Sequence, residues 1–206
     1  MPKLTAIRKQ AVDEMMKAAL VEAAVGVLNE HGFDGMTMDR VAAVAEVAKG
    51  SLYRYFRGKR KLLEFVYAKT IDPVFQDLEE IVASERPAME KLEAQLSSLL
   101  EHVAKHGQVY KLLFQDDTAH GLLQSSERRT SETASRLLAA IFRQGIAESV
   151  FDAKDPLMLA HMYLGLIRGV LRSQPELGER GRREDLCRML LGTLFNGIAT
   201  EKGRAG

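Results

Sequence analysis

Hydrophobic positions recur along most of the chain at spacings of three and four residues, which is the period of an amphipathic helix. The first such stretch covers residues 9–30 and ends at His31-Gly32, a cation followed by a glycine, as is typical of a helix C-terminus. Further helices are predicted over residues 38–45, 49–56, a long stretch from Lys59, 87–106, 108–115, 121–149, 156–173 and 183–200. No strand pattern interrupts them, so we expect an all-α protein with about nine helices.

Some of these helices carry clear start signals. Thr37 is a good N-cap for the helix over 38–45, and Asp39 lies in its first turn. The same helix is expected to turn its apolar side chains inward, namely Val41, Ala42 and Val44. Asp155-Pro156 combines a cap with a proline at the first helical position. Pro73 either kinks the long helix in which it lies or starts a new one with Asp72 as its cap.

Composition excludes several classes of protein. No apolar run approaches the roughly 20 residues of a membrane span, and the N-terminus lacks the apolar region of a signal peptide. The single cysteine, Cys187, cannot form an internal disulfide or a cysteine-based zinc site. These features favour a reduced, cytoplasmic setting.

Charge is placed unevenly, although the formal net charge is only +1. The first 61 residues carry a net charge of +4 and the remainder carries −3. Between Lys49 and Lys61 there are six basic residues and no acidic one. A solvated charged surface would explain most charge runs, but Tyr53 and Tyr55 lie among these cations. The pattern therefore indicates an anionic partner for the N-terminal part.

The helix over 49–56 has two distinct faces. At 100° per residue, Leu52 and Phe56 share one face and are expected to pack on the two preceding helices. The opposite face presents Gly50 and Arg54, flanked by Ser51 and Tyr53. A guanidinium group, hydroxyl groups and a position without a side chain suit contact with base edges and phosphates. Together with the helix over 38–45, this is the layout of a helix-turn-helix unit.

The next helix begins with Lys59, Arg60 and Lys61, which is an unfavourable sign of charge for a helix N-terminus. A sequence selected for stability alone would place acidic residues there. The arrangement is reasonable if an external anion binds at this end, and a DNA phosphate is the natural candidate.

Residues 32–62 contain a dense set of motif positions: Gly32-Phe33 followed by Thr37, the pair Val41-Ala42, then Leu52-Tyr53, Phe56, Lys59 and Leu62. This segment resembles the DNA-binding domain of the TetR family of transcriptional regulators. The resemblance implies a three-helix helix-turn-helix domain over residues 1–58 and a helical ligand-binding and dimerisation domain over 59–206. It implies a ligand-responsive regulator rather than an enzyme, namely a repressor that binds a palindromic operator as a homodimer and is released by a small-molecule effector.

The resemblance also assigns roles within the DNA-binding domain. Thr37 and Lys59 would each contact a phosphate, and Tyr53 and Tyr55 would reach the DNA backbone. The residues that would face the major groove are Lys49, Gly50, Ser51 and Tyr53, to which the helical wheel adds Arg54. The basic start of the chain (Lys3, Arg8, Lys9) could add contacts, although a frayed, solvated terminus is the simpler interpretation.

Two residues depart from the family pattern. Glu46 stands where the family has a turn glycine, so it must avoid or tolerate a left-handed conformation. Ala48 stands where a serine or threonine usually caps the recognition helix. Both substitutions put the contacts made by this turn in question.

The C-terminal part is expected to provide the dimer interface through residues 156–173 and 183–200, whose apolar stripes could instead form intramolecular core. The stripes comprise Tyr163, Leu164, Ile167, Val170 and Leu171, and then Leu186, Met189, Leu190, Thr193 and Leu194. Candidate residues for an apolar effector pocket are Leu99, Val103, Tyr110, Phe114 and Met162, with Arg143 or His161 as polar contacts. For each of these, plain core packing is the simpler interpretation.

Other functions are less well supported by the residues. His102 and His106 have a spacing that can bind a metal, but no third ligand is evident, so we predict neither a metal nor a cofactor. No nucleophile–base motif surrounds Cys187 or the five histidines, which disfavours a small helical enzyme. A protein-interaction module with a basic head remains the alternative to a DNA-binding protein.

Overall fold

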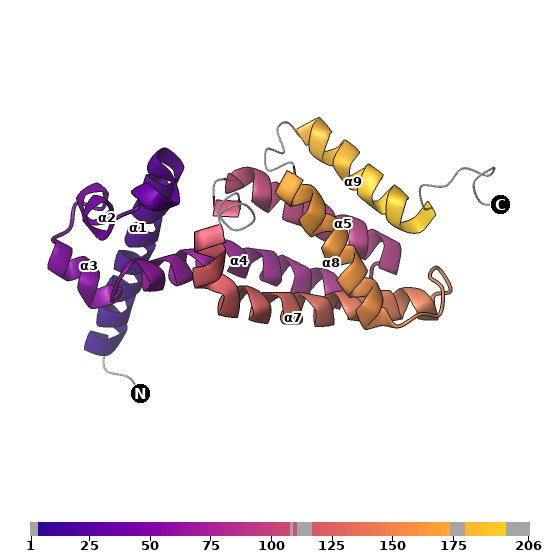
Figure 1. The fold of residues 1–206 in the computed structure, drawn as a ribbon. Coiled ribbons are helices and arrows are strands. Elements are labelled where there is room, and N and C mark those ends of the chain that lie inside the picture. Colours follow the sequence, from indigo (N-terminus) through magenta and orange to yellow (C-terminus); the bar gives the residue numbers. More distant parts are fainter. Residues whose placement is uncertain (1–3, 108, 111–116, 174–179, 197–206) are drawn as a thin grey trace. The chain divides into compact units, whose positions relative to one another are not determined.

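A computed structural model of the chain describes residues 4–107, 109–110, 117–173 and 180–196. The described residues form eight helices and no strand, which confirms the all-α prediction (Figure 1). The helices are α1 (Leu4–Gly35), α2 (Met38–Val44), α3 (Lys49–Tyr55), α4 (Lys59–Ala83), α5 (Ala88–Lys105), α7 (Asp117–Ala147), α8 (Pro156–Ser173) and α9 (Arg180–Asn196). The helix expected over 108–115 and the last residues of the one over 183–200 lie largely outside the described residues.

The chain divides into two compact units. The first comprises residues 1–72 and 108–126, and the second comprises residues 73–107 and 127–206. α4 and α7 each contribute residues to both units. α4 runs without interruption through Pro73, so this proline does not start a new helix.

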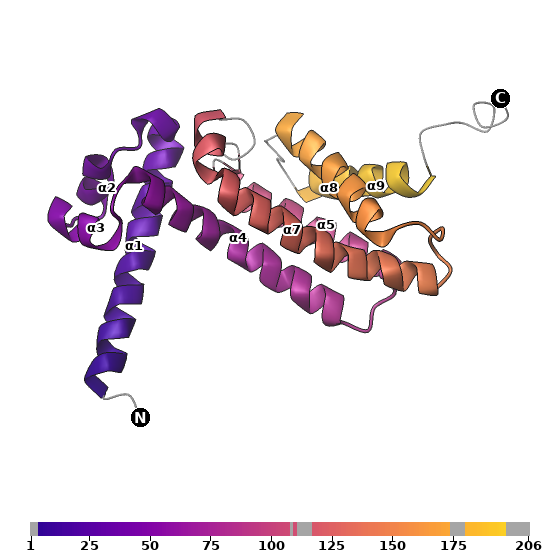
Figure 2. The ribbon, with the colours of Figure 1, turned by 60° about the horizontal axis from the view of Figure 1, so that its bottom comes forward.

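The first unit is built on α1, beside which α2 and α3 lie (Figure 2). Gly32 interrupts the helical backbone with φ 67° and ψ −174°, a conformation that favours glycine, at the place where the sequence predicts the helix to end. Upstream of this break, α1 buries Leu20, Ala24 and Leu28 completely or almost so. α1 begins five residues earlier than predicted, and Ile7, Val12 and Met15 on this N-terminal part are more than half exposed.

The α2 helix differs from expectation at one position. Val41 and Ala42 are buried, as predicted, but Val44 is 55% exposed, so the prediction that it faces inward is wrong. Ala45, the residue directly after α2 and four residues after Val41, is half-buried instead. The chain then turns back, and the Val47 amide donates to the Ala42 carbonyl oxygen at 3.0 Å.

The second unit has a core of leucines and aromatic rings. α9 packs against α5, and Ser97 Oγ lies 3.7 Å from the sulfur of Cys187, which is buried. Phe142 contacts Tyr163 edge-on at 6.1 Å between ring centroids, and Phe151 stacks on Phe195 at 5.3 Å. The start of α8 follows prediction, since Asp155 Oδ1 accepts from the Leu157 amide at 2.9 Å and Pro156 is the first helical residue.

A polar network joins α5 to the ends of α4 and α7. The ammonium group of Lys91, which is only 4% exposed, donates to the Val82 carbonyl oxygen and to Gln144 Oε1, each at 2.8 Å. Pro87 cannot cap α5 with its side chain, and Glu148 Oε2 accepts from the Ala88 amide at 2.9 Å instead. This bond lowers the pKa of Glu148. The network satisfies the buried lysine and one of the free amide groups at the start of α5.

Packing at the end of α7 requires the absence of a side chain at Gly145. A Cβ atom at this position would lie 2.1 Å from Cδ2 of Phe151. We predict that Gly145→Ala lowers the free energy of unfolding by about 1–3 kcal/mol, because the stacked ring must move. Gly121→Ala on the same helix, where a Cβ meets nothing within 4 Å, should raise it by roughly 0.4–1 kcal/mol. Urea denaturation followed by circular dichroism measures both, and equal effects would contradict the packing argument.

Candidate nucleic-acid interface

Thr37 begins the helix-turn-helix unit as the predicted N-cap. Its backbone is extended, with φ −113° and ψ 153°, and its Oγ1 accepts from the Arg40 amide at 3.2 Å. The Arg40 side chain returns to donate to the Gly35 carbonyl oxygen at 2.7 Å. These bonds fix the start of α2, and they leave Thr37 exposed at the surface.

The turn between α2 and α3 contains both departures from the family pattern. Glu46 adopts φ 53°, so it takes the left-handed conformation that a glycine would adopt more easily. Ala48 occupies the N-cap position of α3 and provides no side-chain hydrogen bond. The turn is held by main-chain bonds, including the Glu46 amide to the Ala43 carbonyl oxygen at 3.2 Å. The backbone therefore keeps the helix-turn-helix geometry without the usual side chains.

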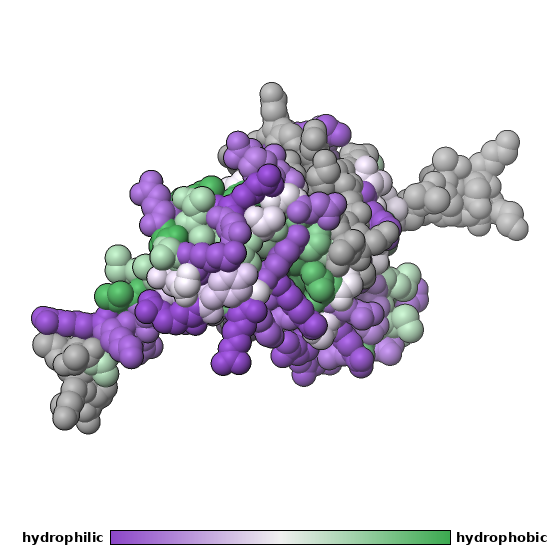
Figure 3. Space-filling model, turned by 60° about the vertical axis from the view of Figure 1, so that its left-hand side comes forward, coloured by the Kyte–Doolittle hydropathy of each residue, from purple (hydrophilic) through white to green (hydrophobic). Residues whose placement is uncertain are grey.

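The two predicted faces of α3 are confirmed. Leu52 is fully buried and Phe56, directly after the helix, is 4% exposed. Gly50 and Arg54 are exposed, Tyr53 is 42% exposed, and Ser51 is half-buried. A Cβ at Gly50 would meet nothing within 4 Å, so the backbone there is open to close approach. In Figure 3 the side bearing α2 and α3 in Figure 1 is turned forward, and hydrophilic side chains cover most of it.

Lys49, at the start of α3, forms an ion pair that the sequence analysis missed. Its ammonium nitrogen lies 2.6 Å from Oδ1 of Asp39, in the first turn of α2. The hydrogen bond to Asp39, with the added attraction of opposite charges, raises the pKa of Lys49. Both side chains are more than half exposed. The pair joins the starts of the two helices at the surface.

Arg54 and Tyr55 are linked to α1. The Tyr55 hydroxyl group donates to Oδ1 of Asp13 at 2.8 Å, and the ring is half-buried. The Arg54 guanidinium group lies 5.1 Å from the centroid of the Tyr55 ring. Tyr55 therefore faces α1 and orients its neighbour, whereas Tyr53 extends to the surface.

Cations at the start of α4 are also held within the chain. Lys59 Nζ donates to the Phe33 carbonyl oxygen at 2.6 Å and lies 3.7 Å from the centroid of the Phe33 ring. Arg60 Nε and Lys61 Nζ lie 3.0 and 2.6 Å from the two oxygens of Glu64. The hydrogen bond from Lys61 lowers the pKa of Glu64. An internal carboxylate thus offsets part of the positive charge that an external anion was expected to balance.

The residues proposed for an effector site differ in burial. Val103 and Tyr110 are buried, Leu99 is half-buried, and burial raises the pKa of the Tyr110 hydroxyl group. The remaining candidates, Arg143, His161 and Met162, are exposed, and Phe114 lies outside the described residues.

His102, one of the two histidines with metal-binding spacing, is bonded to an acidic side chain. His102 Nε2 lies 3.0 Å from Oδ2 of Asp77, which also accepts from the Ser98 hydroxyl group. The described part of the chain contains no group of three or more metal-ligating side chains. Among the described helices, none combines the length and apolarity that crossing a bilayer requires.

α3 is a short helix that exposes hydroxyl groups and cations, and Leu52 and Phe56 are buried beneath it. It follows α2, a capped helix of equal length. This arrangement defines a helix-turn-helix DNA-binding protein. A family model described as "Bacterial regulatory proteins, tetR family" matches residues 20–66, which span α2, α3 and their supporting parts of α1 and α4. Over these residues the chain carries the DNA-binding domain of the TetR family of transcriptional regulators.

Relatives and solved structures agree with this assignment. The HTH-type transcriptional repressor SCO4008 of Streptomyces coelicolor is 29% identical over 150 residues, which cover 71% of this chain and 74% of that protein. FadR from Bacillus subtilis in complex with stearoyl-CoA has a TM-score of 0.74 at 21% identity, covering 88% of this chain and 99% of that one. The fatty acid degradation regulator FadR from Bacillus halodurans has a TM-score of 0.77 at 19% identity, covering 90% and 97%. The relative is a regulator, and the two structures share the fold.

Sequence reasoning missed the bonds of three acidic side chains: Asp39 with Lys49, Glu64 with Arg60 and Lys61, and Asp13 with the Tyr55 hydroxyl group. Glu64 was detectable, because it lies three and four residues after Lys61 and Arg60 on one helix. Asp13 was not, because 42 residues separate it from Tyr55. The local charge run is therefore less unbalanced in the folded chain than in the sequence.

The strained turn gives a direct prediction. Glu46→Gly should raise the free energy of unfolding by about 0.5–1 kcal/mol. Glycine avoids the steric cost of the left-handed backbone conformation, roughly 1–2 kcal/mol for other residues, but it loses more conformational entropy on folding. Urea denaturation provides the measurement, and Glu46→Ala, which keeps a Cβ, is the control. An equal rise in the free energy of unfolding in both variants would indicate that the charge of Glu46, and not its backbone conformation, destabilises the turn.

Proposed function

We propose that the chain is a repressor that binds a palindromic operator as a homodimer and is released by a small, apolar effector. The observation that carries this proposal is the exposed face of α3, with Gly50, Tyr53 and Arg54 outward and Leu52 and Phe56 buried. A helix of this size fits the major groove, and its donors match base-edge acceptors.

Roles follow from position on this surface. Lys49, Gly50, Ser51 and Arg54 would enter the major groove, with Arg54 placed to donate to guanine. Tyr53 and Thr37, both exposed, would contact phosphates. Tyr55 and Lys59 would act mainly by supporting the unit, because the one hydroxyl proton of Tyr55 is donated to Asp13 and the ammonium group of Lys59 is directed at Phe33.

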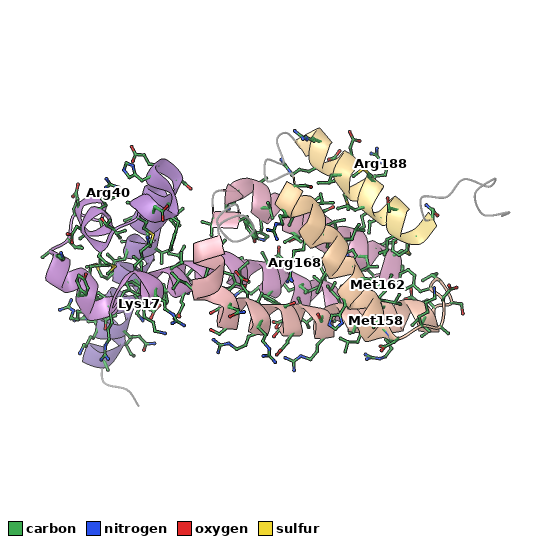
Figure 4. The ribbon with its side chains drawn as sticks, in the orientation of Figure 1. Lys17, Arg40, Met158, Met162, Arg168 and Arg188 are labelled. Carbon is green, nitrogen blue, oxygen red and sulfur yellow. The ribbon has the colours of Figure 1, made fainter. Side chains whose placement is uncertain are left out.

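We assign residues 1–58 to DNA binding and residues 59–206 to effector binding and dimerisation. Within residues 156–173 and 183–200, the apolar side chains are divided between core and surface. Tyr163, Ile167, Leu171, Leu186 and Leu190 are buried within their own chain. The surface of α8 instead carries Met158, Met162, Gly165 and Gly169, and Figure 4 shows the two methionines on the same side of the helix.

This exposed stripe of α8 supports dimerisation. Met158 and Met162 are 56% and 59% exposed, and Met189 on α9 is 55% exposed. A Cβ at Gly165 or Gly169 would meet nothing within 4 Å, so a second helix can approach closely there. A twofold pair of such surfaces would give the symmetry that a palindromic operator requires.

For the effector we propose an apolar molecule, with a long-chain acyl thioester as the first class to test. The support is the common fold with the FadR structure that contains stearoyl-CoA. Val103, Tyr110, Leu99 and Phe114 are our candidates for the apolar part, and Arg143, His161 and Met162 for the outer part. A DNA-binding role places the protein in the cytoplasm, with the chromosome.

DNA recognition by α3 predicts two kinds of variant. Arg54→Ala should change base preference at one position by about 1–3 kcal/mol, whereas Tyr53→Phe should weaken selected and random duplexes alike. Fluorescence anisotropy with a duplex enriched by in vitro selection measures both. Arg128→Ala, which removes an exposed cation from α7, is the control. An Arg54 variant that behaves like this control would contradict the assignment.

Dimerisation predicts that Met162→Lys shifts the protein toward a monomer, because the interface would bury an unpaired ammonium group in each protomer. Analytical ultracentrifugation over a range of concentrations measures the shift, and it should be at least tenfold in dissociation constant. Met89→Lys, at an exposed methionine of α5, should leave the assembly unchanged. A monomeric unmodified protein would rule out the dimer.

A further inference from the structure

The carboxylate of Asp39 lies on the surface through which the chain would bind DNA, and it is bonded to Lys49. The Oδ1···Nζ distance is 2.6 Å, and the two side chains are 64% and 58% exposed. We propose that Asp39 determines specificity: it competes with backbone phosphates for Lys49 and so weakens binding to DNA of the wrong sequence. This inference rests on the proposed DNA-binding function.

Stability alone does not account for the pair. An ion pair this exposed adds little to folding, because water screens it and two mobile side chains must be ordered. Asp39 does lie in the first turn of α2, where a negative charge is favourable, but that effect does not require Lys49. A surface evolved only for tight binding to a polyanion would leave this lysine unpaired.

The competition follows from what each partner offers Lys49. A phosphate offers the same kind of charged acceptor as Asp39, so moving the ammonium group to a phosphate gains little. The move also leaves the Asp39 carboxylate unpaired near a polyanion, which is unfavourable. A sequence-independent contact through Lys49 is therefore weakened.

A matching base sequence avoids this penalty. Guanine O6 and N7 are uncharged acceptors, so Lys49, which has three N–H donors, can keep its bond to Asp39 while it donates to them. A phosphate that shared Lys49 with Asp39 would instead bring a second negative charge beside the carboxylate. The carboxylate can in addition accept from the N4 amino group of a neighbouring cytosine. Correct DNA thus keeps both charges satisfied, and specificity arises largely from the cost imposed on incorrect DNA.

The test compares the full-length protein with Asp39→Asn and with a matched control, Asp152→Asn. Asp152 is also exposed and pairs with a lysine, Lys154, at 3.3 Å, in the segment between α7 and α8. The probes are a random-sequence duplex of about 30 base pairs, roughly three helical turns, and a duplex of equal length enriched by in vitro selection with the unmodified protein. Fluorescence anisotropy from about 50 to 200 mM salt gives affinity and salt slope for each.

We expect Asp39→Asn to bind the random duplex roughly 3–10 times more tightly at low salt, with no gain on the selected duplex. The slope of log affinity against log salt should become steeper by about one per protomer on the random duplex, because Lys49 now displaces a counterion. Asp152→Asn should retain the unmodified specificity ratio and slope.

A second comparison separates competition for Lys49 from simple repulsion. In a Lys49→Met background, Asp39→Asn should lose most of its effect on the random duplex. An effect of equal size in both backgrounds would show that Asp39 acts as an isolated charge, and it would overturn the proposal. Asp39→Ser provides a second uncharged variant if the asparagine protein does not fold, as judged by circular dichroism.

The remaining outcomes separate a failure of the role proposed for Asp39 from a failure of the proposed DNA-binding function. If the unmodified protein selects a duplex but Asp39→Asn matches Asp152→Asn, the role of Asp39 is wrong and DNA binding stands. If the unmodified protein binds neither duplex, the proposed function itself fails.

Discussion

The burial of Leu52 and Phe56 beneath α3 is the constraint on which the rest of the DNA-binding surface depends. α3 has only seven residues, so two buried positions one turn apart fix its rotation against α1 and α2. Once that rotation is fixed, Gly50, Tyr53 and Arg54 have no direction available except outward. The apolar core of a small helical unit thereby determines which polar groups are offered to a ligand.

Charges around this helix are arranged by bonds within the chain. Lys49 is held by Asp39, Arg54 lies over Tyr55, and Lys59 is bound at Phe33. Holding long side chains before a ligand arrives reduces the entropy lost on binding. It also means that DNA competes with partners inside the chain, so affinity depends on the residues that hold the cations as well as on the cations themselves.

Local pattern was enough to predict the helices that the structure describes, the cap at Thr37, the start of α8 and the two faces of α3, because each depends on residues within a few positions. The inward orientation of Val44 was wrong because the chain reverses directly after α2. Contacts such as Tyr55 with Asp13, or Glu148 with Ala88, join residues 42 and 60 positions apart, and no periodicity encodes them. The buried and exposed sides of α8 likewise depend on which neighbouring helix covers it.

The position of Cys187 has a practical consequence for studying movement in this protein. It is the single thiol in the sequence, it is 6% exposed, and burial raises its pKa. At neutral pH it is therefore a poor nucleophile toward alkylating reagents. A cysteine introduced at an exposed position of the recognition helix would be labelled selectively, so a spin label or fluorophore could be attached there without first removing the native residue.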